Sequence, residues 1–164
     1  MAYTVFRCDN MPGTDQRAYI ASVLVQDSSG NPIEVENGTI VEIGDLIDGK
    51  HDLYAATLAT KTSTVANCAV IGTPEVIYDD HLKKNLDDFI NEAGKPATAY
   101  LLGHGGVFSV TKEGFVNGTV PTKAGKTVAV GIGTNGKIDS AGTGLGTILD
   151  IDQTNRYTYY AVRL

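Results

Sequence analysis

Turn-forming residues recur along this chain at intervals that leave little room for long helices. The 164 residues include nineteen glycines, and Asn-Gly pairs stand at 37–38, 117–118 and 135–136. Glycine adopts the positive φ angles that tight turns require, and an Asn-Gly pair is a strong signal for a turn between two antiparallel strands. The chain is therefore expected to fold as short strands joined by tight turns.

Between these turns lie short segments rich in Thr, Val, Ile and Tyr, which are residues that pleated strands favour. We expect strands at 4–6, 17–25, 39–43, 67–71, 97–102, 107–110, 127–130, 137–139, 147–151 and 157–164. The segment 53–58 is short and ambiguous. This pattern predicts a mainly β fold of the α+β class, built as a small β-barrel, a β-tulip-like domain or a sandwich.

One segment, residues 80–91, carries a helical pattern. Four apolar residues fall at positions i, i+4, i+7 and i+8, which is one stripe at helical period: Leu82, Leu86, Phe89 and Ile90. Asp79 or Asp80 is suited to cap the start, and Gly94 followed by Pro96 supplies a stop. A single short helix is expected here.

Residues 1–16 are expected to form an extended N-terminal arm, because the stretch from Asn10 to Gly13 breaks the chain in a turn. The arm carries Tyr3, Phe6 and Met11, whose apolar side chains need cover. Either the rest of the protein covers them, which is the default interpretation for a monomer, or a partner does. Residues 17–164 contain no evident linker or repeat and are expected to form one β-rich domain.

The charge balance bears on possible partners. Thirteen basic and nineteen acidic side chains give a formal net charge of −6, and no run of Lys and Arg is present. Because binding to duplex DNA depends on basic side chains that neutralise phosphates, direct nucleic-acid binding is not expected. The chain also has neither the pattern of a secretory signal nor an apolar run near about 18 residues, so a soluble protein made in the cytoplasm is expected.

Two cysteines, Cys8 and Cys68, have a spacing that matches no metal motif. They are able in principle to pair, but two thiols in a reducing compartment are the simpler interpretation.

The stretch Gly131–Gly136 matches the G-x-G-x-x-G string of dinucleotide-binding proteins. In such a site the string opens a helix whose N-terminus holds the pyrophosphate. Here an Asn-Gly turn and a strand-like segment follow, so a hairpin turn is the favoured interpretation. The later glycines at 142–146 lack the lysine of a phosphate loop.

The remaining polar candidates are isolated. His81 beside Asp79 and Asp80 is a conceivable metal cluster, but a solvated helix start explains these residues more simply. His104 lies among glycines that suit either an active-site loop or a hairpin corner, and the corner is favoured. Asp87 and Asp88 are neighbours that face different directions on a helix. We therefore assign no catalytic, cofactor-binding or metal-binding residue, and a non-enzymatic protein is expected.

The stretch from Thr73 to Phe115 carries a resemblance to a known class of proteins. It contains an N-x-x-D-F segment (Asn85, Asp88, Phe89), then Ala93-Gly94-Lys95-Pro96, a strand, and V-F-S-V-T at 107–111. This order resembles the capsid decoration, head-stabilising or head-fibre proteins of tailed bacteriophages that infect Gram-positive bacteria. The strand-like segments around Arg17–Tyr19 and Asn37–Val41, with 124–128 and 135–137, are compatible with the same pattern.

The resemblance implies a structural virion protein that binds the outer surface of an icosahedral shell and stabilises it. Its partner would be the major capsid protein, and similar proteins often sit on the shell as trimers. Under this hypothesis the residues Tyr3, Phe6 and Met11 of the arm are candidates for capsid contact, with the arm adding a strand to a capsid sheet edge. The alternative is a carbohydrate- or ligand-binding module of a phage fibre or another minor virion component. That alternative favours exposed aromatic platforms, and the chain has eight Tyr but no Trp.

Overall fold

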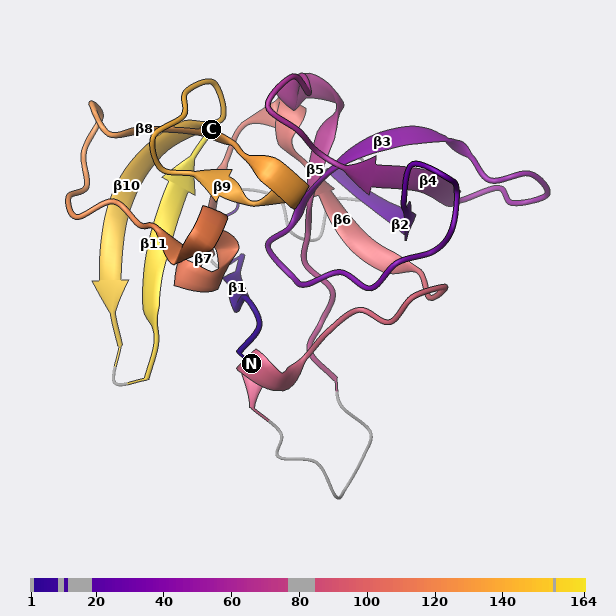
Figure 1. Ribbon diagram of the computed structural model, residues 1–164, viewed down its shortest axis with the longest axis horizontal. Coiled ribbons are helices and arrows are strands. Elements are labelled where there is room, and N and C mark those ends of the chain that lie inside the picture. The colour runs from indigo at the N-terminus through magenta and orange to yellow at the C-terminus, as the bar shows by residue number, and fades with distance from the viewer. Residues whose placement is uncertain (1, 9–10, 12–18, 77–84, 155) are drawn as a thin grey trace.

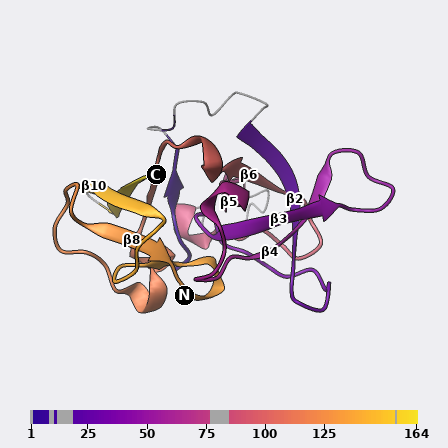
Figure 2. The same cartoon turned by 90° about the horizontal axis from the view of Figure 1, so that it is seen from above.

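The computed structural model describes residues 2–8, 11, 19–76, 85–154 and 156–164. The protein is mainly β and consists of two β units that lie side by side (Figures 1 and 2). One unit is a closed barrel and the other is a curled six-stranded sheet. The mainly β fold expected from the sequence is confirmed.

The barrel is built from residues 20–101. Its strands are β2 (Ile20–Gln26), β3 (Ile40–Leu46), β4 (Leu53–Leu58), β5 (Cys68–Ile71) and β6 (Ala97–Leu101). They close in the order β2-β4-β3-β5-β6, and β6 pairs with β2 to complete the ring. The β2–β4 pair is parallel, and the other neighbours are antiparallel. The β3–β4 hairpin extends away from the sheet in both views (Figures 1 and 2).

The sheet joins the N-terminal segment to the second half of the chain. Its strands are β1 (Phe6–Arg7), β7 (Val107–Val110), β8 (Ala129–Ile132), β9 (Ile138–Asp139), β10 (Gly146–Gln153) and β11 (Thr158–Arg163). They are antiparallel in the order β1-β7-β11-β10-β8-β9. Single 3-10 turns connect many strands: η2 (Val65–Asn67), η3 (Leu86–Asp88), η4 (Leu102–His104), η5 (Lys112–Gly114), η6 (Val116–Gly118) and η7 (Thr134–Gly136).

Small side chains fill the barrel. Its buried cluster contains only Val, Ala and Ile: Val23, Val25, Val35, Val41, Ala56, Ala69, Ile71, Ala97 and Ala99. A closed ring of few strands has a narrow interior, so short side chains are the ones that fit. Partly buried residues such as Tyr54 pack at the margin of this cluster.

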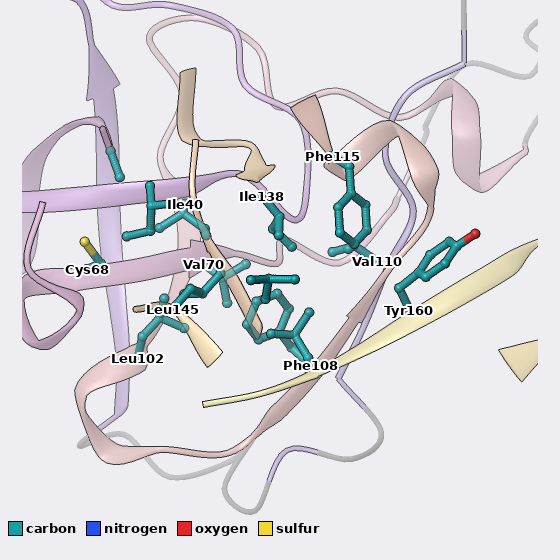
Figure 3. Packing of buried hydrophobic residues seen from close by; sticks show 14 of the residues in the cluster. Ile40, Cys68, Val70, Leu102, Phe108, Val110, Phe115, Ile138, Leu145 and Tyr160 are labelled. Carbon is teal, nitrogen blue, oxygen red and sulfur yellow. The ribbon is translucent and has the colours of Figure 1, made fainter. Parts of the chain in front are cut away.

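A second core lies between the barrel and the sheet (Figure 3). The barrel contributes Ile40, Cys68 and Val70, which alternate along β3 and β5 with residues of the barrel interior. The sheet contributes larger side chains, among them Phe108 and Tyr160. Strand β5 is therefore buried on both faces, which explains why its four residues are all apolar.

The β8–β9 hairpin joins the two units at a second place. Its turn η7 lies against the barrel, where the Gly136 N–H donates to the Ala59 carbonyl at 3.0 Å. Gly136 has φ +68°, and a Cβ at this position would overlap the backbone oxygen of Ile40. Only glycine combines this backbone conformation with so close an approach.

The expected strands are confirmed in the described residues, with bounds that shift by a few positions. The ambiguous segment 53–58 is strand β4, which pairs with both β2 and β3. The Gly131–Gly136 string is the end of β8 followed by the turn of the β8–β9 hairpin, as favoured from its Asn-Gly pair.

The helix expected over 80–91 is wrong in the part that the structure describes. Residues 80–84 lie outside the described residues, and of the remainder only Leu86–Asp88 form a single 3-10 turn. Phe89 is extended at φ −85° and ψ 133°. Asn91 exchanges two backbone hydrogen bonds with Val35, and its side-chain amide donates to the Val35 carbonyl. These long-range bonds need extended backbone, and they outweigh the local apolar period.

Of the N-terminal arm expected over 1–16, the structure describes residues 2–8 and 11. Phe6 and Arg7 form β1, which pairs with Val110 and Ser109 of β7. The Val5 side chain is 1% exposed and that of Phe6 is 8% exposed. This segment is thus an edge strand of the sheet, because its apolar side chains find cover inside the same chain.

Candidate binding surface

The three arm residues singled out in the sequence have different environments. Phe6 packs in the core between the units, with its ring centroid 6.2 Å from those of Tyr100 and Phe108. Tyr3 is half-buried, and its N–H donates to the Asp87 carbonyl at 3.0 Å. Met11 is half-buried and packs against the same core as Phe6. Phe6 is therefore a core residue of this chain, and only Tyr3 and Met11 keep partial exposure.

A polar cluster beneath the N-terminal segment connects three distant parts of the chain. The Lys137 Nζ donates to Glu36 Oε2 at 2.8 Å and to the Glu113 carbonyl at 2.9 Å. It also donates to Thr4 Oγ1 at 3.3 Å, and Thr4 in turn donates its N–H and its hydroxyl to Glu36. The ammonium group thus bonds to a residue before β1, a residue before β3 and a residue of η5.

The ionised state of Glu36 depends on this cluster. Burial raises the pKa of the Glu36 carboxyl, but hydrogen bonds from Lys137 and Thr4 lower it by more, so the pKa lies below its ordinary value. The carboxylate form is therefore the one that the fold stabilises. The side chains of Lys137 and Glu36 are 22% and 24% exposed, so water screens the pair only in part.

A second cluster lies where the β10–β11 hairpin meets β1. The Arg7 guanidinium donates to Asp152 at 2.8 Å and lies over the Tyr159 ring, 4.5 Å from its centroid. Tyr157 donates its hydroxyl to Asp87 at 2.8 Å. That hydrogen bond is the main reason why the pKa of the Asp87 carboxyl lies below its ordinary value. Figure 1 shows this hairpin projecting past the other strands of the sheet.

The polar residues considered as candidates for catalysis or metal binding do not lie together in the structure. His104 lies in the turn between β6 and β7, and its ring packs on Tyr19 at 4.2 Å between centroids. Asp87 binds Tyr157 whereas Asp88 accepts the Asn85 N–H, so the two neighbours have separate partners. Asp79, Asp80 and His81 lie outside the described residues. Within the described ranges, no group of three or more His, Cys, Asp or Glu side chains is placed to hold a metal ion.

Both cysteines are thiols in the structure. Burial, with a smaller contribution from the nearby Glu42 carboxylate, raises the pKa of the Cys68 thiol to about 11. A thiol with so high a pKa is almost entirely protonated near neutral pH and reacts slowly, because the thiolate is the nucleophile. Among the residues that the structure describes, no helix has the length and apolar character needed to cross a bilayer.

Sequence reasoning did not identify the residues that form the two clusters. Lys137 is 101 positions from Glu36, and Arg7 is 145 positions from Asp152. A contact at such a separation leaves no trace in local spacing. The strand pattern predicts that these residues lie in or next to strands, but only the pairing order brings them together.

Comparison with known proteins adds no relative. No protein-family model, no curated protein and no solved structure matches this chain.

Proposed function

We propose that this protein is a structural virion protein that binds the outer surface of a tailed-bacteriophage capsid and stabilises the shell. The observation that carries the proposal is the resemblance of residues 73–115 to capsid decoration and head-fibre proteins. In this proposal the partner is the major capsid protein, and the protein acts on the virion surface as a homo-oligomer such as a trimer.

The way in which the two β units are joined supports this role. A brace on a shell under internal pressure has to resist deformation, and a body with one shared core deforms less than two tethered units. Here the larger core takes side chains from both units, and the η7 turn and the Lys137 cluster connect them again. The segment of resemblance begins just after β5 and includes β6, β7 and η5, so it contains the connection between the units.

The alternative, a carbohydrate-binding module, receives less support from the aromatic residues. A sugar platform needs an open ring face, but Arg7 covers one face of Tyr159 and Arg156 lies 5.2 Å from the Tyr157 ring centroid. These two rings are held in cation–π pairs within the chain.

Binding to shells tests the proposal. Purified protein would be added to shells assembled from the major capsid protein alone, and occupancy and the temperature of shell rupture would be measured. Saturable binding to the outer surface with a higher rupture temperature is expected. Absence of binding to intact shells, together with retention of the protein on a glycan array, would replace the proposal with the alternative.

A further inference from the structure

The outer edge of β10 is open along half of the strand. Strand β8 pairs with β10 only at Gly146 and Thr147, with one further bond from the Ile148 N–H to the Val128 carbonyl. From Asp150 to Gln153, β10 pairs with β11 on one side. No described residue is paired to its other side over this stretch. In Figure 1 this half of β10 extends below β8 at the outer margin of the sheet.

An open edge presents backbone groups to a partner. Every second residue of an antiparallel strand directs its N–H and C=O away from the paired neighbour. Such a row of donors and acceptors is a template for another strand, and many proteins bind extended peptides in this way. The barrel has a stretch of the same kind, because β5 pairs with β3 only from Ile40 to Glu42. That stretch, residues 43–46, carries a single carboxylate, Asp45, whereas the edge of β10 carries two.

The charges along this edge restrict what can occupy it. Asp150 and Asp152 are two residues apart on one strand, so their carboxylates lie on the same face of the sheet, and both are exposed. Arg7 forms an ion pair with Asp152, whose side chain remains 48% exposed. Among the described residues, none forms an ion pair with Asp150. The Gly125 N–H donates to the Ile148 carbonyl, and β8 begins at Ala129, opposite Thr147. The negative stretch of β10 therefore lies beyond the first residue of β8.

A second copy of this chain is a poor occupant. In an antiparallel pair centred on Ile151, Asp150 of one copy would lie opposite Asp152 of the other, and the reverse. Like charges directly opposite on a sheet face destabilise the pairing. The register shift between Ile148 and Asp150 also bends the strand, and bulges of this kind disfavour pairing between identical edges. A strand with basic residues at alternate positions instead places opposite charges on this face.

We infer that the edge from Leu149 to Gln153 accepts an extended segment of the major capsid protein that carries Lys or Arg at alternate positions. This inference rests on the proposed function for the identity of the partner, whereas the edge and its charges are properties of this chain alone. It reverses the arrangement expected from the sequence, in which the N-terminal arm of this protein supplied the added strand.

Peptide binding tests the edge without the shell. The probe is a capped hexapeptide of alternating Val and Lys, and its counterpart is the same peptide with Glu in place of Lys. Each peptide is titrated into the protein, and binding is followed by the NMR shifts of the protein's backbone amides. We expect shifts at 149–153 with the Lys peptide. D150K should weaken its binding about tenfold and improve binding of the Glu peptide, since a favourable cross-strand charge pair becomes unfavourable.

The matched control is D48K, which makes the same change of charge at an exposed residue beyond the end of β3. D48K should bind the Lys peptide like the unmodified protein. Equal weakening by D150K and D48K, or amide shifts that map away from 149–153, would overturn the inference.

Shell binding separates the two proposals. On shells that take up the protein, amide hydrogen exchange at 149–153 should slow and D150K should lower occupancy more than D48K. Normal occupancy with unchanged exchange at these residues would overturn the edge inference and leave the proposed function standing. If the protein does not bind shells while the Lys peptide still binds at the edge, the proposed function fails and the strand-acceptor site remains.

Discussion

The barrel and the sheet differ in the side chains that form their cores and in whether their strands close into a ring. The barrel is formed by a continuous stretch of chain, closes into a ring and contains only Val, Ala and Ile in its buried cluster. The sheet combines β1 with strands from the C-terminal half, has open edges, and packs Phe and Tyr against the outer face of the barrel. A narrow closed ring is sensitive to added volume, whereas a broad core between two units is sensitive to lost volume.

The largest expected effect is loss of volume in the shared core. Phe108 is fully buried in the core that takes side chains from both units, so F108A should reduce the free energy of unfolding by about 3–5 kcal/mol. Urea unfolding followed by far-UV circular dichroism measures this loss. A decrease near 1 kcal/mol, as expected for a surface site, would show that the two units do not share one core.

The next effect concerns the contact between η7 and the barrel. In G136A the added Cβ would meet the Ile40 carbonyl, and the residue would keep a positive φ that alanine disfavours. We expect a loss of about 3 kcal/mol. The matched control is G144A, which also has a positive φ, +97°, but has open space at its Cβ position. If thermal melts of G136A and G144A shift equally, the hairpin does not depend on its approach to the barrel.

A larger side chain in the interior of the barrel should destabilise it. Ala99 is fully buried in the ring, so A99L should overpack it and cost about 2 kcal/mol. Hydrogen exchange of the amides of β2 and β5 would measure this locally. If exchange in these strands is unchanged in A99L, the barrel has free volume, and it is then no more sensitive to added volume than the core between the units.

The smallest effect concerns the polar cluster that ties the N-terminal segment to both units. K137M removes the ammonium group from Glu36, and we expect a loss of about 1 kcal/mol at neutral pH, since the pair is partly solvated. Because the folded-state pKa of Glu36 lies below its ordinary value of 4.5, its contribution is present above that pH and is lost as the pH falls through the folded pKa.

Denaturant titrations across this pH range provide the check. The unmodified protein should lose stability as the pH falls below 4.5, and K137M should lose less over the same interval. A parallel pH dependence in the two proteins would show that Lys137 does not set the pKa of Glu36. K126M, which removes an exposed lysine outside the cluster, serves as the control for net charge.

The strand positions could be predicted well because their signals are local. The apolar run of β5 and the Asn-Gly turn between β8 and β9 identify their structures within a few residues. The predicted helix failed at 85–91 because its apolar period competes with backbone bonds between Asn91 and Val35, 56 positions apart in the chain. The cover of Phe6 could not be identified for a related reason, since Tyr100 and Phe108, which pack on it, are remote in the sequence.

The candidate site was less predictable than the fold. The sequence directs attention to the apolar residues Tyr3, Phe6 and Met11, but the structure places Phe6 in the core. The open edge of β10 could not be predicted, because the residues of this strand show the same β pattern as those of the other strands. Whether a strand has one neighbour or two depends on the pairing order of the sheet, and the hydrophobic periodicity of the sequence does not reveal that order.

The sequence by itself determined where the strands and turns lie, that Gly131–Gly136 makes a hairpin, and that short strands dominate, because each depends on residues close together in the chain. The tertiary structure decided that β2 to β6 close into a ring, that β1 returns to the C-terminal sheet, and that β10 keeps an open acidic edge. These outcomes depend on long-range pairing and on burial of one face against another, and such contacts are settled by the free energy of the whole fold.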